Sequence, residues 1–360
     1  MKKTNSLLSY RFSSKNQKNI IKGKNLSFPV SEIQTSSHNH CPACGNEEGW
    51  LIAEVDRVGF PCDTVICKSC QFVINDSYLS NPISFYEKYW GEEHWGNPKE
   101  NWMRRTSPDA YSWKRMAYVA MNLGNQFQGI DNILEIGCGD GCNLFPYHLF
   151  GKSVLGCDYD DKYLDMGRTQ GMNLISGGID SIPDDKKFDL IQLVHVFEHM
   201  LNLDEEISKI KKLIKINGFV YVEVPGILNW NRKNSESVKE DGFSSSNNFL
   251  SYLQLQHNYH FDLAHLLLFW ERNGLKVISC DEWARIIFQK KNGETNFING
   301  DQSSTDVLSY LQEIEEDYNR VLLNSWKKQL LSPRFIAAQI KRGLLNSIKS
   351  FPKVNQDLSN

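Results

Sequence analysis

Short, mainly apolar runs recur through the middle of the chain and alternate with segments whose apolar residues have helical spacing. The runs occupy residues 133–136, 153–157, 188–194, 219–224, 275–280 and 284–289, and the clearest helical segment spans 204–214. Strands buried on both faces show such runs, and their alternation with helices is typical of a parallel sheet. The pattern predicts an α/β fold whose sheet ends in an antiparallel edge, and we expect a seven-stranded sheet, one strand more than these six runs.

The turn after the first of these strands is the strongest candidate for a ligand site. Residues 135–141 read Glu-Ile-Gly-Cys-Gly-Asp-Gly, and glycine lets the backbone adopt positive φ and approach a ligand closely. Asp158 ends the second strand about 20 residues later, where a carboxylate can accept hydrogen bonds from both hydroxyls of a ribose. Several nucleotide-binding folds share this arrangement, so the turn alone leaves the cofactor open.

Four motifs in order resemble those of class I S-adenosylmethionine-dependent methyltransferases. They are the glycine turn, the acidic strand end at Asp158, the segment 188–199 that ends in Glu198-His199, and the strand 219–225 that follows Asn217-Gly218. The resemblance implies a Rossmann-like sheet with S-adenosylmethionine as the cofactor. The implied cofactor-binding residues are Glu135, Gly137, Cys138, Gly139, Gly141, Asp158, Tyr159, Ile179 and His195. The acidic residue with which this family contacts adenine aligns with Gly178, so the adenine contact is left to the backbone near Ile179 or to Asp180.

Two Cys-x-x-Cys pairs stand near the start of the chain. They are Cys41 with Cys44 and Cys67 with Cys70, and this spacing is typical of a zinc ribbon in which four thiolates form a closed, structural site. Two disulfides are the alternative. The chain shows no apolar signal segment and no long apolar run, so we expect a cytoplasmic protein, in which disulfides are disfavoured.

Charge is distributed unevenly over the 360 residues. The first and last forty residues each hold seven Lys or Arg against one acidic residue, which leaves about −15 formal charges between them. Such a surface disfavours nucleic acid as the substrate. We predict a basic flexible tail (1–37), a zinc-ribbon module (38–80), an aromatic and helical linker (81–130), the methyltransferase domain (131–292) and a helical basic extension (293–360).

Some segments leave alternatives open. Ser107-Pro108 predicts the start of a helix that runs toward Leu123. The polar segment 226–249 is either a substrate lid or an insertion. The basic amphipathic stretch 335–348 is expected to dock on the protein or on a second subunit, with peripheral membrane contact as the alternative. The oligomeric state is left open.

A finer resemblance covers roughly residues 38–290. The ribbon, the core and the segment His257-Asn258-Tyr259-His260-Phe261 resemble the zinc-ribbon methyltransferases of bacterial surface-polysaccharide gene clusters and, more distantly, nucleotide-sugar C-methyltransferases. The acceptor that this implies is a small molecule or a nucleotide-linked sugar. In the C-methyltransferases a Glu-His pair opens this segment, and its histidine takes part in proton abstraction. His257 matches that histidine, whereas Gln256 replaces the glutamate.

The atom that is methylated stays open. The nucleotide-sugar C-methyltransferases carry a further α/β half, and the 68 residues beyond Asn292 are too few to build one. Methylation of a hydroxyl or an amine is therefore an alternative to carbon methylation.

The candidate catalytic residues follow from the same segment. We expect His257 to be the general base, because an imidazole titrates near neutral pH, with Tyr259 and His260 lining the acceptor pocket. The alternative is that these histidines pack or cap the following helix and that His195, at the end of the fourth strand, contributes instead.

Two other functions are compatible with the motifs. One is an RNA base methyltransferase, although Arg57 is the one basic residue between Cys44 and Cys67, among five acidic residues. The other is a scaffold that binds the cofactor without catalysis.

Overall fold

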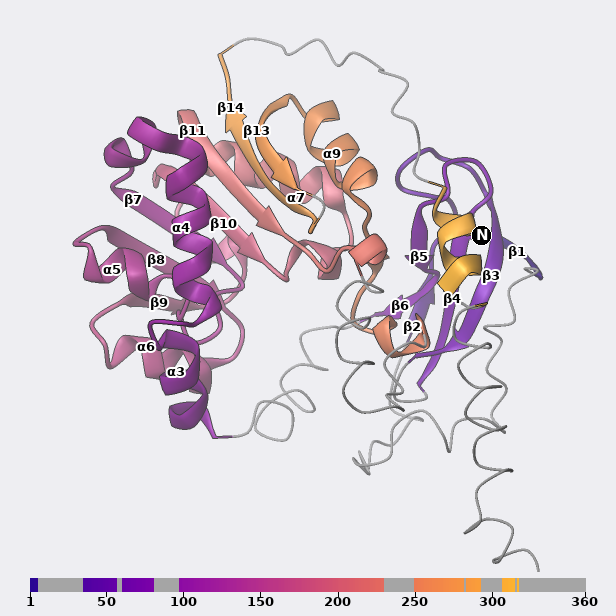
Figure 1. The fold of residues 1–360 in the computed structure, drawn as a ribbon, viewed down its shortest axis with the longest axis horizontal. Coiled ribbons are helices and arrows are strands. Elements are labelled where there is room, and N and C mark those ends of the chain that lie inside the picture. Colours follow the sequence, from indigo (N-terminus) through magenta and orange to yellow (C-terminus); the bar gives the residue numbers. More distant parts are fainter. Residues whose placement is uncertain are drawn as a thin grey trace, which may run out of the picture.

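The computed structural model describes residues 1–5, 35–56, 60–80, 97–229, 249–281, 283–292, 306–314 and 316. The chain forms a large α/β domain and a smaller β module that lies beside it (Figure 1). None of the described helices is long and apolar enough to span a membrane.

A seven-stranded sheet forms the centre of the α/β domain, in the order β13-β14-β11-β10-β7-β8-β9. The strands are β7 (Asn132–Ile136), β8 (Ser153–Asp158), β9 (Asn173–Ser176), β10 (Phe188–Val194), β11 (Ile214–Glu223), β13 (Leu275–Asp281) and β14 (Arg285–Lys290). The strands from β9 to β11 run parallel, and β14 and β13 pair antiparallel at one edge. The predicted sheet with its antiparallel edge is therefore confirmed.

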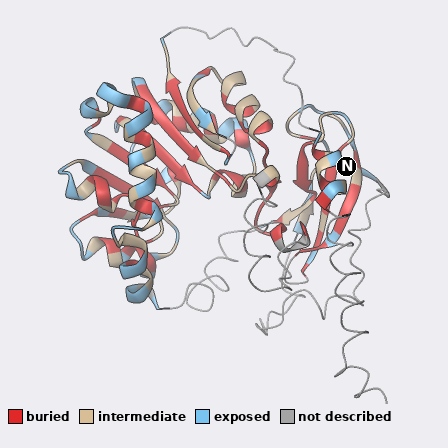
Figure 2. Ribbon diagram, in the orientation of Figure 1, coloured by how far each residue is buried: buried red, intermediate tan, exposed pale blue. Residues whose placement is uncertain are grey.

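Helices cover both faces of this sheet, because successive residues of each strand point to opposite sides. Ile133 packs in one buried cluster with Val119 of a helix, whereas its neighbour Leu134 packs in another with Ile207. The first face carries α4 (Tyr111–Leu123), α5 (Phe145–Leu149) and α6 (Asp161–Arg168), and the second carries α7 (Leu203–Leu213) and α9 (Leu263–Arg272). The strands are buried along most of their length, while the outer sides of the helices are exposed (Figure 2).

Shorter helices connect these elements. They are α3 (Pro98–Thr106) and the 3-10 helices η4 (Gly124–Gly129), η5 (Ile179–Ser181), η6 (Phe197–His199), η7 (Ile227–Asn229) and η9 (Phe249–Tyr252). The helix predicted to start at Ser107-Pro108 starts later, at Tyr111. Ser107 instead ends α3, where its hydroxyl donates to the carbonyl oxygen of Arg104 at 3.0 Å. The prediction placed Ser107 at the wrong end of a helix, because serine satisfies free backbone groups at either end.

The β module holds a five-stranded sheet in the order β1-β3-β4-β5-β12. Its strands are β1 (Lys2–Asn5), β3 (Glu48–Val55), β4 (Pro61–Cys67), β5 (Val73–Asn75) and β12 (Tyr259–His260), and beside it β2 (Thr35–Ser37) pairs with β6 (Ser77–Leu79). Strands β1 and β2 belong to the stretch 1–37 that was predicted to be a flexible tail. These two segments form strands, which that prediction did not include, because the edges of β3 and β6 offer backbone groups with which a short strand can pair.

The module and the α/β domain share contacts over a wide area. Strand β12, which lies between β11 and α9 of the large domain in sequence, pairs antiparallel with β5 of the module. The guanidinium of Arg272 on α9 donates to the carbonyl oxygens of Pro42 (3.1 Å) and Ala43 (3.0 Å) in the first cysteine turn. The ring of Phe72 stacks on that of Tyr259, with centroids 5.7 Å apart. The β module therefore packs against the α/β domain and shares a strand pairing with it.

Several expectations for the outer segments lie partly or wholly outside the described residues. Residues 307–314 are helical, and Val307, Leu311 and Ile314 pack in one cluster with Ile52 of the module. The aromatic stretch 81–96, the polar segment 230–248, the basic stretch 335–348 and most of both tails lie outside.

Candidate cofactor and acceptor site

The glycine turn follows β7 at the carboxyl edge of the sheet. Gly137, Gly139 and Gly141 have φ of +67°, +55° and +78°. A Cβ atom on Gly137 would lie 2.4 Å from a methyl carbon of Val196, so this position requires glycine. Nothing lies within 4 Å of the corresponding point on Gly139, which leaves room for a ligand above the turn.

Asp158 lies at the end of β8, next to this turn. Its Oδ2 accepts a hydrogen bond from the backbone N–H of Gly139 at 2.8 Å, and its Oδ1 accepts one from Asp160 at 3.1 Å. Burial raises the pKa of Asp158, and the backbone donors partly oppose that effect. Each carboxylate oxygen has two lone pairs, so both keep the capacity to accept a ribose hydroxyl. The turn and this carboxylate fit the adenosine half of S-adenosylmethionine.

Tyr159, the residue after Asp158, lies against Gly178, the residue before Ile179. A Cβ atom on Gly178 would be 2.3 Å from the Tyr159 hydroxyl oxygen, so the tyrosine occupies the space over that glycine. Tyr159 is 45% exposed, which leaves its ring open to a ligand. Asp180, the alternative adenine contact, instead pairs with the ammonium of Lys209 at 3.2 Å.

Glu135, the residue two positions before Gly137, is fully buried. Its Oε1 accepts a hydrogen bond from the Asn143 amide at 2.8 Å, whereas Oε2 has no hydrogen-bond donor among the described residues. Burial raises the pKa of this carboxyl to about 8, although Asn143 acts in the opposite direction. Cys138 is also buried, at the base of the turn.

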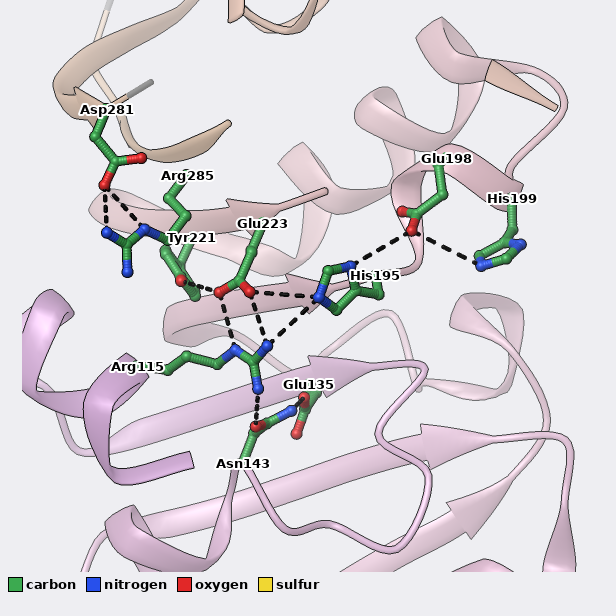
Figure 3. Close-up of polar contacts among 10 residues, drawn as sticks. All are labelled: Arg115, Glu135, Asn143, His195, Glu198, His199, Tyr221, Glu223, Asp281 and Arg285. Atoms are coloured by element: carbon green, nitrogen blue, oxygen red, sulfur yellow. Dashed lines mark hydrogen bonds and ion pairs between the residues drawn. The ribbon is translucent and has the colours of Figure 1, made fainter. Parts of the chain in front are cut away.

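A charged network next to the turn joins α4 to the ends of β10 and β11 (Figure 3). Arg115 donates to both oxygens of Glu223, at 2.9 and 2.7 Å, and to the Asn143 side-chain oxygen at 3.2 Å. Nε2 of His195 lies 3.4 Å from Glu223 Oε1. The sequence analysis did not identify Arg115 or Glu223. Arg115 lies on the buried face of an amphipathic helix, one turn before Val119, and that unusual place for an arginine is the pattern that could have revealed it.

His195 is central to this network. It has a φ of +57° and exposes 44% of its side chain. Desolvation lowers its pKa, but the carboxylates of Glu198 and Glu223 outweigh that effect and raise the pKa to about 9. An imidazole with this pKa is protonated at neutral pH, so it favours binding or orienting a negative charge over accepting a proton.

The three residues expected to form the acceptor pocket lie in two different environments. His257 lies beside His199, with ring centroids 4.8 Å apart. Tyr259 donates its hydroxyl to the carbonyl oxygen of Leu201 at 2.5 Å, and His260 is hydrogen-bonded to the Asn75 side chain of the module at 3.1 Å. Burial lowers the pKa of His260 to about 3. These contacts favour a packing role for Tyr259 and His260, and the centroid of the His260 ring lies 6.1 Å from that of His257.

The four paired cysteines converge in the module. The sulfur atoms of Cys41 and Cys70 are 3.6 Å apart, and those of Cys44 and Cys67 are 3.5 Å apart. A disulfide needs about 2.05 Å, and all nine cysteines are free thiols. Zinc–sulfur bonds of about 2.3 Å in a tetrahedron place the sulfurs roughly 3.8 Å apart. The four thiols, whose sulfurs all lie within 4.8 Å of one another, therefore fit a closed zinc site.

Comparison with known proteins identifies the domain that carries the glycine turn. Residues 105–280 match the model of a family described as a methyltransferase domain. A ubiquinone biosynthesis O-methyltransferase of Pelagibacter ubique is 28% identical over 122 residues, which are 30% of this chain and 51% of that protein. The C-methyltransferase NovU of Streptomyces niveus is 21% identical over 272 residues, which are 69% of this chain and 57% of NovU.

Solved structures show the same kind of match at lower similarity. An S-adenosylmethionine-dependent methyltransferase from Mesorhizobium loti aligns with 51% of this chain and 99% of its own, with 15% identity and a TM-score of 0.36. The chain spans about half the length of the curated relatives it matches. The part of the chain that resembles methyltransferases is thus residues 105–280.

Proposed function

We propose that the protein transfers a methyl group from S-adenosylmethionine to a small-molecule acceptor, because residues 105–280 match the model of a methyltransferase domain. The observation that carries the proposal is the open glycine turn next to the Asp158 carboxylate at the carboxyl edge of the sheet. Ligands of open α/β sheets bind at this edge. Gly137, Gly139 and Asp158 would hold the ribose, and Tyr159 and Ile179 would contact the adenine.

The cofactor supplies an electrophilic methyl group on a sulfonium. The acceptor atom forms a bond to the methyl carbon while the carbon–sulfur bond breaks, and the electron pair of that bond stays on sulfur. Alignment of the two reactants supplies much of the acceleration, and a hydroxyl or acidic C–H acceptor must also lose a proton. We assign His257 to the acceptor side of the site as the residue that promotes this loss.

We further propose that the acceptor is a sugar or a nucleotide-linked sugar used in surface glycan synthesis. The support is the resemblance of residues 38–290 to zinc-ribbon methyltransferases of polysaccharide gene clusters. The relatives leave the methylated atom open, since one is named an O-methyltransferase and the other a C-methyltransferase. The zinc would be structural, because four thiolates leave no open position for a substrate.

Binding and turnover measurements on the full chain test this function. Calorimetry should show binding of S-adenosylhomocysteine and much weaker binding of NAD. Methyl-labelled S-adenosylmethionine should transfer label to a member of a panel of nucleotide-linked sugars and not to total RNA. Label in RNA would contradict the sugar assignment, and cofactor binding with no transfer to any candidate acceptor would support a scaffold.

A substitution at His257 tests its assigned role. His257→Ala should lower turnover by about 100-fold, as expected when a group that promotes proton loss is removed, while the affinity for S-adenosylhomocysteine stays the same. His148→Ala, on α5 away from the acceptor residues, is the matched control and should keep full turnover. Turnover of His257→Ala within a few-fold of wild type would return His257 to a packing role.

A further inference from the structure

Glu198, His199 and His257 form a compact group beside the end of β10. Glu198 and His199 lie in η6, and His257 lies just before β12. One ligand atom from each of the three side chains lies within 4.8 Å of the other two. Glu198 is 1% exposed and His257 is 6% exposed, whereas 25% of the His199 side chain is exposed, so the group is buried on one side and open to solvent at His199.

The Glu198 carboxylate is buried beside two imidazoles. Neither oxygen accepts a hydrogen bond from the described residues. The ring nitrogens His195 Nδ1 and His199 Nε2 lie 3.7 and 3.9 Å from Oε1, which is too long for a hydrogen bond (Figure 3). His195 places an imidazole beside this carboxylate without bonding to it, so both carboxylate oxygens keep the capacity to bind a cation on the His199 side. The gap between carboxylate and imidazole is the width that an ion bound to both would fill.

The tautomer of His199 is set for metal binding. Its Nδ1 lies 2.8 Å from the carbonyl oxygen of Gln256, so Nδ1 carries the proton and donates it. The lone pair is therefore on Nε2, the atom that faces Glu198. Histidines that bind metals usually donate their other ring N–H to a backbone carbonyl or a carboxylate in this way.

The two chain segments that hold the group are also tied together. The Asn258 side-chain amide donates to the carbonyl oxygen of His199 at 2.6 Å. This contact joins the residue after His257 to the segment that carries Glu198 and His199. The three side chains are thus held in place by backbone contacts before any ligand arrives, which favours a binding site over a chance cluster.

We propose that Glu198, His199 and His257 bind one divalent transition-metal ion. One carboxylate and two imidazoles suit Zn²⁺, Mn²⁺ or Fe²⁺ and, unlike four thiolates, leave coordination positions open. An acceptor oxygen fits an open position, where the cation lowers the pKa of a hydroxyl and its proton is released to solvent before methyl transfer. This inference rests on the proposed function and refines the role of His257, which acts on the acceptor through the metal.

Cobalt titration of the full chain tests the site, once the cysteine site has been shown by elemental analysis to hold zinc. Wild-type protein should bind one Co²⁺ per chain in addition to that zinc, with visible d–d absorption and no thiolate charge-transfer band. Glu198→Gln should weaken Co²⁺ binding by about 100-fold or more, since it removes the charged ligand. Glu205→Gln, on the exposed side of α7, is the matched control and should bind Co²⁺ like wild type.

Other outcomes separate this inference from the proposed function. If Glu198→Gln does not fold, His199→Leu takes its place, and folding of either variant is checked by circular dichroism. No Co²⁺ beyond the cysteine site, a thiolate band, or unchanged affinity in the folded variant would overturn the metal site. Co²⁺ binding without binding of S-adenosylhomocysteine would leave the metal site standing and remove the proposed function.

Discussion

Arg115 on α4 and Glu223 at the end of β11 form a two-pronged ion pair across 108 residues of sequence, with N–O distances of 2.9 and 2.7 Å. The two side chains are 16% and 13% exposed, so the pair is largely buried. The hydroxyl of Tyr221 donates to the same carboxylate at 2.6 Å. The pair fixes α4 against the sheet edge at which we place the cofactor and the acceptor.

Removing one partner of this pair should destabilise the protein. Arg115→Met should lower the free energy of unfolding by about 3 kcal/mol, because the Glu223 carboxylate stays buried without its cation. Urea unfolding measures the change. Lys152→Met is the control, since Lys152 pairs with Asp131, which is 73% exposed, and it should cost less than about 1 kcal/mol.

A double substitution shows whether the effect belongs to the pair. Arg115→Met combined with Glu223→Gln should cost less than the sum of the two single changes, because the double variant leaves no unpaired charge. Additive costs would show that the two side chains act independently and would remove the pair as the cause.

The cysteine site should hold one zinc per chain. Cys67→Ser should lose the metal and lower the thermal stability of the module, because the closed site supplies folding free energy. Elemental analysis and a thermal melt measure both. Cys280→Ser is the control, since this exposed thiol lies on β13 outside the site. Stoichiometric zinc and native stability in Cys67→Ser would disprove the assignment.

Asp158 should account for much of the cofactor affinity. Asp158→Ala should weaken binding of S-adenosylhomocysteine by on the order of 2 to 3 kcal/mol, the value of two charge-assisted hydrogen bonds to a ribose. Calorimetry measures the change, with Asp165→Ala on the exposed side of α6 as the control. Equal affinities of the two variants for S-adenosylhomocysteine would show that Asp158 does not bind the ribose.

Glu135 should make the stability of the ligand-free protein depend on pH. Burial raises the pKa of its carboxyl to about 8, so the folded protein holds this proton more tightly than the unfolded chain does. The contribution is fully present below the unfolded pKa near 4.5 and is lost as the pH rises through 8. Urea unfolding between pH 5 and 9 should show a loss on the order of 3 kcal/mol in wild type.

The matched variant for this pH effect is Glu135→Gln, which keeps the shape and the bond to Asn143 but carries no titrating proton. Its stability should change less over the same range. Parallel pH profiles for the two proteins would show that another group causes the dependence.

The sequence predicted the sheet well because local pattern determines it. Each buried strand is a mainly apolar run. The turn after β7 is recognisable because glycines, which tolerate positive φ, occupy positions such as Gly137 and Gly139. The spacing of the cysteine pairs is likewise a local pattern, and the four sulfurs that it predicted to converge lie within 4.8 Å of one another. These features need no knowledge of distant parts of the chain.

The features that the sequence did not predict depend on contacts between distant residues. Arg115 and Glu223 are 108 positions apart, and Glu198 and His257 are also far apart in the sequence. Each pair comes together only in the folded chain, so no short sequence motif contains both partners. The short strands β1 and β12 are too brief for a periodic pattern and exist because β3 and β5 offer free edges. His260 resembled a catalytic residue by its motif, and only its contact with Asn75 shows its packing partner.

Strand β12 is synthesised long after the other strands of the module sheet. Both cysteine pairs have emerged by residue 70, yet the strand that closes their sheet is Tyr259–His260, and the contact between Asn75 and His260 spans 185 positions. The nascent module therefore keeps the edge of β5 open while most of the α/β domain is being synthesised. Open strand edges recruit other chains. Premature termination before residue 259 would thus produce a fragment that aggregates through the open edge of β5. In the completed chain β12 pairs with that edge and covers it.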